Sequence, residues 1–245
     1  MELRAWVYTA GQAREALSCP EIGAVYVPMK TAAELSEQCG KIILLPPEFL
    51  ADCEERTERE LAKHAEMGFR RALAHTVGHI ELLQRCGYTV CGGNRLNCAN
   101  SESMRFFADC GLNDIIVSPE LTAARLNALE KPIPTGFLAY GHLPLMINRR
   151  CPINDGKPCG KPNCGRHITD RRGEKLRVIC SENTVEILNS DVLMLSGRLS
   201  GFHADFAVLR FTTEENVSEI ASLYAKDAKA DIGRLTRGLY YRGVQ

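Results

Sequence analysis

The chain has 245 residues, of which 45% are hydrophobic and 24% charged, and its formal net charge is zero. This composition is ordinary for a globular protein with one large domain or two small ones. Charges at positions 2 and 4 and the absence of a long apolar run near the start exclude a secretory signal and a membrane span there, which predicts a cytoplasmic protein without a membrane partner.

Nine short apolar runs follow one another along the chain, with helix-like segments rich in Ala, Glu, Leu and Arg between most of them. These candidate strands lie at 5–9, 24–28, 41–46, 71–76, 88–93, 114–119, 136–141, 191–196 and 206–212. Alternating strands and helices predict parallel βα units, and uniformly apolar strands are typical of a sheet buried on both faces. We therefore expect an α/β fold, a (β/α) barrel of the TIM type. Such a barrel has eight strands, so one of the nine runs must lie outside it.

Residues 148–188 read as an insertion into this barrel, which 1–147 and 189–245 would form. Because the insertion leaves few residues for the barrel, we expect the barrel to be compact or imperfect. Pro and Gly interrupt the first part of the insertion, and HITDRRGEKLRVIC (167–180) alternates around an Arg-Arg-Gly turn as a β-hairpin does. Segment 149–177 holds nine Lys or Arg and three acids. That excess predicts contact with RNA or another anion, although a merely solvated loop would show the same pattern.

Four of the eleven cysteines, Cys151, Cys159, Cys164 and Cys180, fall in the insertion. Three share the Pro- and Gly-rich loop, and the returning strand of the hairpin brings the fourth. Since the segment is too polar for an apolar core, we expect the four thiolates to hold either a tetrahedral zinc or an iron–sulfur cluster. The long, uneven spacing departs from the CxxC pairs of zinc ribbons. Among the other cysteines, Cys98 alone follows a strand end, where a thiol can take part in chemistry.

Several motifs span nearly the whole chain. They are VCGGNRLNCANS (90–101), VSPELT (117–122), FLAYGHLPLMINRRCPIN (137–154), the hairpin that closes on Cys180, ILNSDVLML (187–195) and TRGLYYRGV (236–244). Together with the cysteine block they resemble the collagenase-like peptidases, family thirty-two of the U peptidases. The resemblance is closest to the carboxyl-terminal half of the longer, fused members. It implies a partial or split version that a partner subunit or a separate amino-terminal half would complete.

The resemblance implies a cofactor and a reaction. Members of the family hold a [4Fe-4S] cluster with their cysteine quartet and take part in oxygen-independent hydroxylation. Here the same cluster would be held by Cys151, Cys159, Cys164 and Cys180, and the substrate would be an rRNA or tRNA base or a small aromatic molecule. Two alternatives stay open: a collagenase-like peptidase, as the family label says, and a non-catalytic barrel, stabilised by zinc or iron, that binds nucleic acid or a partner.

The sequence contains little that supports a proteolytic activity. His75-Thr-Val-Gly-His79 lacks the glutamate of a zinc-protease helix, and it straddles a strand end where the two rings are not expected to converge. Two ordinary polar side chains at a strand–helix junction are the expected reading of this motif. A GxSxG nucleophile elbow does not occur, because GRLSG (197–201) misses the spacing.

Candidate site residues follow from the rule that a βα barrel places its chemistry where strands end and loops begin. Glu120 is a candidate base, although a helix-capping carboxylate is an equal alternative. His142 is a candidate proton relay next to the cysteine loop, or a structural histidine. Asn94, after two glycines, can bring an amide to a ligand or occupy a left-handed turn, and Asn97 is a further polar candidate nearby.

Three arginines are candidate substrate-binding residues. Arg149 and Arg150 immediately precede the first cysteine ligand, where their charges can stabilise a cluster with four thiolates and hold an anionic substrate. Arg210 lies near the end of the last candidate strand, 206–212, and is selected by the same rule that selects the other residues at strand ends.

Overall fold

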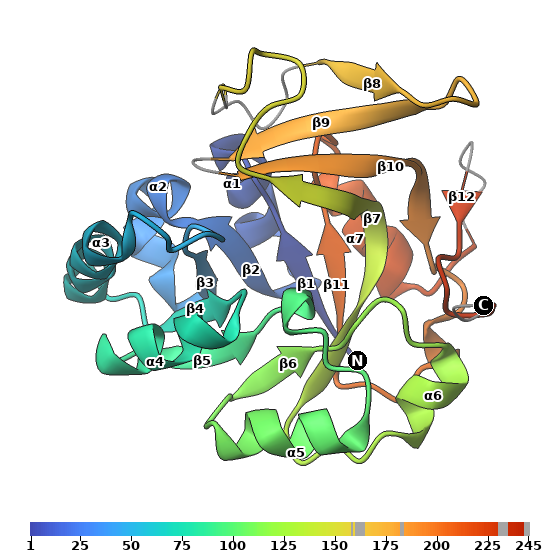
Figure 1. Ribbon diagram of the computed structural model, residues 1–245. Coiled ribbons are helices and arrows are strands. Elements are labelled where there is room, and N and C mark those ends of the chain that lie inside the picture. Colours follow the sequence, from blue (N-terminus) through green and yellow to red (C-terminus); the bar gives the residue numbers. More distant parts are fainter. Residues whose placement is uncertain (158, 160–164, 182–183, 230–234, 243–245) are drawn as a thin grey trace.

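Eight parallel strands close into a barrel in the computed structural model, which describes residues 1–157, 159, 165–181, 184–229 and 235–242. The last barrel strand pairs with both the first and the seventh, so the ring of hydrogen-bonded strands is complete. The barrel strands are β1 (Glu2–Trp6), β2 (Ile22–Pro28), β3 (Ile42–Leu45), β4 (Arg71–Ala74), β5 (Thr89–Gly92), β6 (Asp114–Ile116), β7 (Thr135–Asn148) and β11 (Phe206–Arg210). The expected (β/α) barrel is confirmed, and it is closed (Figure 1).

Helices lie around the outside of this barrel (Figure 1). They are α1 (Ala10–Ser18), α2 (Met29–Ala32), α3 (Glu54–Glu66), α4 (Val77–Arg85), α5 (Ser101–Asp109), α6 (Ala123–Ala128) and α7 (Val217–Ala225), with 3-10 turns η1 (Ala33–Lys41), η2 (Asn94–Leu96) and η3 (Leu199–Gly201). Local sequence sets several helix starts. For α1, the Thr9 side chain accepts from the Gln12 backbone amide while the Gln12 side chain accepts from the Thr9 amide, a reciprocal cap. Within the described ranges, no helix has the length and apolar character needed to cross a membrane.

The ninth apolar run, at 191–196, is the one that lies outside the barrel. It forms the end of β10 (Thr184–Met194), which pairs antiparallel with the outer part of β7. Strand β7 leaves the barrel at Gly141, whose φ is +112° and whose added Cβ would lie 2.1 Å from the Arg210 carbonyl oxygen. Only glycine fits this backbone and this close approach. Beyond it, β7 carries the chain away from the barrel and begins a separate sheet.

This separate sheet, in the order β7, β10, β9 and β8, stands at the top of Figure 1. Strands β8 (His167–Thr169) and β9 (Lys175–Ser181) form the predicted hairpin, and its turn includes Gly173 at φ +82°. We call the sheet with its cysteine-bearing loop the outgrowth. We expected no apolar core here, but the outgrowth has a small one, formed by Cys151, Val178, Cys180, Val185 and Ile187. Two of these residues, Val185 and Ile187, come from β10 and not from the polar loop.

Candidate functional site

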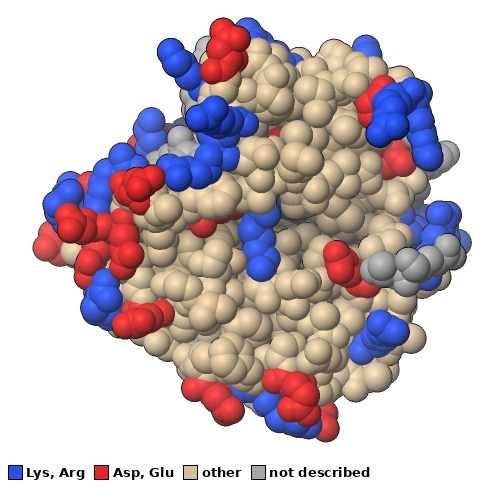
Figure 2. Space-filling view, viewed as in Figure 1, with Lys and Arg blue, Asp and Glu red and all other residues tan. Residues whose placement is uncertain are grey.

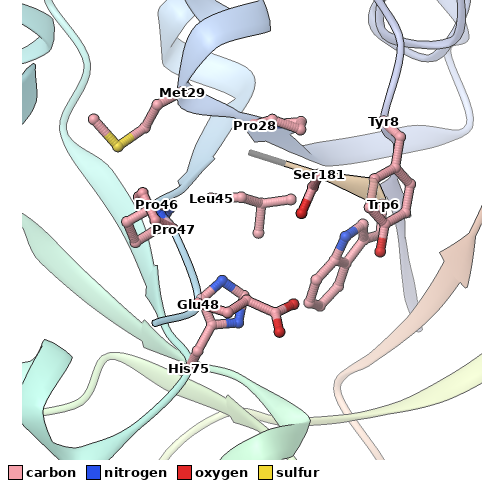
Figure 3. A pocket seen from close by; sticks show the side chains of 10 residues that line it. All are labelled: Trp6, Tyr8, Pro28, Met29, Leu45, Pro46, Pro47, Glu48, His75 and Ser181. Carbon is pink, nitrogen blue, oxygen red and sulfur yellow. The ribbon is translucent and has the colours of Figure 1, made fainter. Parts of the chain in front are cut away.

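A small cavity of about 40 Å³ lies at the carboxyl ends of the barrel strands β1 to β4. We call it the mouth cavity. Its lining residues are Trp6, Tyr8, Pro28, Met29, Leu45, Pro46, Pro47, Glu48, His75 and Ser181 (Figure 3). All but Ser181 come from the barrel, and Ser181 ends β9 of the outgrowth. The outgrowth therefore covers the end of the barrel where barrel enzymes keep their active sites.

Two buried polar side chains in the lining lack hydrogen bonds. His75 is 1% exposed and Trp6 is 3% exposed. Both ring nitrogens of His75 and Nε1 of Trp6 are without a hydrogen-bond partner among the residues that the structure describes. Burial, reinforced by the ring of His79, holds the pKa of His75 well below its ordinary value, so the imidazole is neutral. A neutral imidazole has one donor and one acceptor, and both can bind a ligand here.

The second histidine of the motif has a different role. His79 Nδ1 lies 2.8 Å from the Thr76 hydroxyl and Nε2 lies 3.0 Å from the Pro47 carbonyl oxygen. The His75 and His79 rings are neighbours, with centroids 5.6 Å apart in an edge-to-face arrangement, but both His79 nitrogens are taken up by Thr76 and Pro47. Helix α4 begins directly after Thr76 and turns His79 back toward the strand end. His79 is thus structural, whereas His75 faces the cavity.

A network of buried charges adjoins the mouth cavity. Arg210 and Glu186 form an ion pair whose side chains are 4% and 5% exposed, and the Tyr8 hydroxyl contacts both. Arg95 bridges Glu186 and Glu48, and its Nε lies 3.1 Å from a Glu48 oxygen. Since Glu186 belongs to β10 and the other four residues to the barrel and its loops, the network ties the outgrowth to the barrel.

The two carboxyl groups of this network have opposite pKa shifts. Burial and the nearby negative charge of Glu186 raise the pKa of Glu48 to about 7, although Arg95 opposes the rise. Burial alone would also raise the pKa of Glu186, but the charges of Arg210 and Arg95 outweigh it and lower the value. Glu186 is therefore ionised, while Glu48 exchanges a proton near neutral pH. A carboxyl group of this kind is suited to acid–base chemistry.

Replacing Glu48 with glutamine is expected to change how stability depends on pH. The folded-state pKa of Glu48 lies above the ordinary 4.5, so the folded protein holds a proton that the unfolded chain releases, and this contribution is lost as pH rises toward about 7. Wild type should therefore lose stability relative to Glu48→Gln across that window, by about 3 kcal/mol. Urea unfolding at several pH values measures the effect, with the exposed Glu37→Gln as control. If the free energy of unfolding depends on pH in the same way in wild type and Glu48→Gln, the raised pKa of Glu48 is contradicted.

The cysteines of the outgrowth form a second group. Cys151 is 5% exposed and Cys180 is 0% exposed, and both pack in the small outgrowth core. Burial, a hydrogen bond with the Cys159 side chain and the proximity of Cys159 and Cys151 raise the pKa of Cys180 to about 12. Cys180 thus packs with Cys151 in the outgrowth core and makes a hydrogen bond with the Cys159 side chain, while Cys164 falls outside the described residues. Across the described ranges, no group of three or more His, Cys, Asp or Glu residues has the arrangement of a metal site.

The donor chemistry of this group nevertheless suits an iron–sulfur cluster. Thiolates are the soft ligands that such a cluster takes, and a cubane needs its sulfurs farther apart than a single ion does. Cys151 and Cys180 are held by strand pairing and by the outgrowth core. Cys159 lies on the exposed side of the group.

Among the predicted arginines, Arg210 lies in the buried network, whereas the other two lie on the surface. Arg149 pairs with Asp52 at 3.1 Å, with both side chains more than half exposed, and Arg150 is exposed beside it. An exposed ion pair of this kind contributes little to stability. Neither Arg149 nor Arg150 lines the mouth cavity.

The predicted catalytic residues are placed apart from one another. The ring of His142 is buried, with Nδ1 2.7 Å from the Asn189 carbonyl oxygen, and its own carbonyl oxygen accepts from Arg210 at 3.0 Å. His142 thus positions Arg210. Glu120 is exposed on the loop after β6 and does not line the mouth cavity. Asn94 is half-buried at the start of η2, and it is Asn97, at φ +51°, that takes the left-handed conformation.

Cys98 is fully buried, and its sulfur lies 3.3 Å from the Ser103 hydroxyl. Burial raises its pKa, although Ser103 opposes the rise. A buried thiol of raised pKa is a poor nucleophile, because the thiolate is the reactive form. Cys98 is therefore a packing residue here.

Sequence reasoning missed several residues of the mouth. Tyr8 and Glu48 each stand just after an apolar run, so the strand-end rule that selected Arg210 would also have found them. The sequence indicates Glu186 less clearly, because its only mark is that it is an acidic residue in the otherwise apolar run TVEIL (184–188). A buried acid in a strand indicates a buried partner, but its partner could not be named before the outgrowth was placed on the barrel.

No protein-family model matches the chain, and no curated protein matches its sequence. Solved structures do match in fold. The U32 peptidase Mk0906 has a TM-score of 0.51 at 12% identity over 87% of this chain and 94% of that one. The native KDPGal structure has a TM-score of 0.50 at 14% identity over 93% and 94%. Orotidine 5'-phosphate decarboxylase from Pyrococcus horikoshii has 0.50 at 10% identity over 92% and 98%. At these identities the likeness shows the fold alone, a βα barrel shared by the U32 peptidase and the other two.

Proposed function

We propose that this chain holds a [4Fe-4S] cluster with Cys151, Cys159, Cys164 and Cys180 and takes part in the oxygen-independent hydroxylation of a planar substrate at the barrel mouth. The substrate is an rRNA or tRNA base or a small aromatic molecule, and the protein acts in the cytoplasm. One observation supports the proposal: Cys180, which packs with Cys151 and makes a hydrogen bond with Cys159, lies on a strand whose next residue lines the mouth cavity.

Strand alternation explains how the two sites are related. Successive side chains of a strand point to opposite faces. Cys180 therefore faces the outgrowth core, while Ser181 faces the mouth cavity. The paired strand β10 follows the same rule, since Val185 packs beside Cys180 and Glu186 faces the barrel network. A single layer of β-sheet thus separates the thiols from the cavity.

This arrangement suits a redox role for the cysteine site. A bound cluster would supply or accept electrons across that sheet layer. The chain itself would bind and orient the substrate: the Trp6 indole N–H and the neutral His75 ring offer hydrogen bonds, and Glu48 can hold or release a proton. Trp6, Tyr8 and the prolines of the lining offer flat, largely apolar surfaces, which favour a planar ring. At about 40 Å³ the cavity holds no more than a water or two, so a ring would bind there only once the cavity has widened.

The surface of the outgrowth supports an anionic substrate. Figure 2 shows Lys and Arg side chains at the upper left and upper right of the molecule, where the outgrowth lies, with some Asp and Glu among them and a largely uncharged surface between. Cations beside the mouth would attract the phosphates of RNA and so favour an RNA base over an uncharged small aromatic molecule.

The peptidase alternative has less support. The likeness to the U32 peptidase Mk0906 is one of fold, and the buried Cys98 thiol lacks the character of a nucleophile. Thr76 and His79 do form a hydroxyl–imidazole pair, but Thr76 is the residue at which α4 begins and the contact holds that helix start in place.

Comparing modified nucleosides tests the proposal. Cells that lack the protein, grown without oxygen, should lose one hydroxylated nucleoside from digested rRNA or tRNA, or one hydroxylated small aromatic metabolite. Wild type and Cys86→Ser should restore it, since Cys86 is a half-buried cysteine at the end of α4, outside the outgrowth. Cys151→Ser should not restore it. If mass spectrometry finds no hydroxylated product that depends on the protein, the proposed reaction is wrong.

A further inference from the structure

A second cavity, of about 560 Å³, lies between the end of β10 and the carboxyl-terminal segment that contains β12 (Leu235–Thr236). It shares no lining residue with the mouth cavity. Four cations and one acid line it: Arg198, Lys229, Arg237, Arg242 and Asp191. Within the described parts of the chain, no carboxylate forms an ion pair with any of the four cations. Their charge is therefore available to an anion.

The motif TRGLYYRG builds one wall of this cavity. Tyr240 is 1% exposed, and its hydroxyl donates to the Leu138 carbonyl oxygen at 2.9 Å. Strand β12 pairs with β10, and Gly238 turns the chain at φ +58°. With Tyr240 anchored in the core, the next residue, Tyr241, faces outward and is 47% exposed. The Arg198 guanidinium lies over its ring, 5.4 Å from the centroid.

Ser196 supplies an independent sign of a ligand. It lines the cavity and is 8% exposed, so its side chain is more than nine-tenths buried. Its hydroxyl oxygen has no hydrogen-bond partner among the residues that the structure describes. A buried hydroxyl without a partner is unfavourable, and a ligand oxygen in the cavity would satisfy it.

We propose that this cavity binds a nucleotide through its phosphate group. Arginine side chains hold phosphate oxygens in pairs, and Lys229 adds a further positive charge. The Ser196 hydroxyl would donate to another phosphate oxygen. The volume lies within the range of about 300–1,000 Å³ that is usual for small-molecule sites, which is more than a bare phosphate needs. The exposed Tyr241 ring offers a surface on which a base can stack.

The site is independent of the cysteines, so its test does not require a metal. Titration calorimetry with the full chain compares AMP, inorganic phosphate and adenosine. AMP should bind saturably and about tenfold more tightly than inorganic phosphate, because only AMP stacks on Tyr241. Adenosine, without the phosphate, should give no measurable binding. Tyr241→Ala should lower the affinity for AMP but leave the affinity for inorganic phosphate unchanged.

Charge reversal tests the phosphate contacts. Arg237→Glu should lower the affinity for AMP at least about tenfold. The matched control Arg59→Glu, on the exposed side of α3, should change that affinity less than about twofold. Ser196→Ala, a milder variant that preserves the fold, should also lower the affinity for AMP. If AMP does not bind saturably, or if Arg59→Glu lowers the affinity for AMP as much as Arg237→Glu does, this cavity is not the binding site. Equal affinity for AMP and inorganic phosphate would overturn its assignment to a nucleotide.

Discussion

Cys159→Ser is expected to lose its iron and to open the outgrowth loop to proteases. Serine oxygen is a hard ligand and does not replace a thiolate on iron. The outgrowth core holds Cys151 and the strands, and the described loop residues 152–157 make local contacts such as that of the Asn154 side chain with the Lys157 carbonyl oxygen. Without a cluster, local opening of this loop should increase, and cleavage in it should become at least about tenfold faster.

The choice of protease decides what this experiment can show. Lys157 and Lys161 each precede a proline, so trypsin would not report on the loop. A protease without such a requirement, proteinase K, followed by mass spectrometry, should place the new cuts between residues 152 and 166. The control Cys86→Ser should keep wild-type iron and wild-type cleavage. Unchanged iron and unchanged cleavage in Cys159→Ser would remove Cys159 from the ligand set.

Arg210→Ala is expected to cause the largest loss of stability of any substitution at the barrel mouth. Arg210 and Glu186 are almost fully buried, and Tyr8 contacts both. Removing the guanidinium leaves the Glu186 carboxylate buried with Arg95 alone, and breaking a buried pair in this way costs about 3–5 kcal/mol. In a chain of this length such a loss lowers the melting temperature by about 10 °C.

Two comparisons identify the cause of that loss. Arg85→Ala removes a half-exposed arginine that pairs with Glu58 at 3.0 Å, and it should cost about 1 kcal/mol or less. The double variant Arg210→Met, Glu186→Leu removes both charges and should be more stable than Arg210→Ala alone. If Arg210→Ala is no more damaging than Arg85→Ala, the network does not hold the outgrowth on the barrel.

The barrel was predictable because its first six strands are short, apolar and each followed by a helix. The position of the ninth strand was not. The run 191–196 is as apolar as the barrel strands, because β10 packs between the outgrowth and the barrel. Its antiparallel partner is the stretch of β7 around Gly141, where β7 leaves the barrel, and local sequence patterns do not reveal that exit.

The candidate site was only partly predictable for a related reason. Arg210 was found from its place at a strand end, but its partner Glu186 comes from the segment that folds back over the barrel. The cysteine spacing correctly indicated that Cys151 and Cys180 come together through the hairpin. It gave no sign that the opposite face of the same strand would line the mouth cavity. Such relations depend on tertiary contacts, which sequence periodicity does not contain.

The metal content of the wild-type chain, purified without oxygen, tests most directly whether the outgrowth cysteines hold an iron–sulfur cluster. The account predicts a brown protein with broad absorbance near 400 nm and about four iron and four sulfide per chain. A colourless protein that contains one zinc, or no metal, would contradict it.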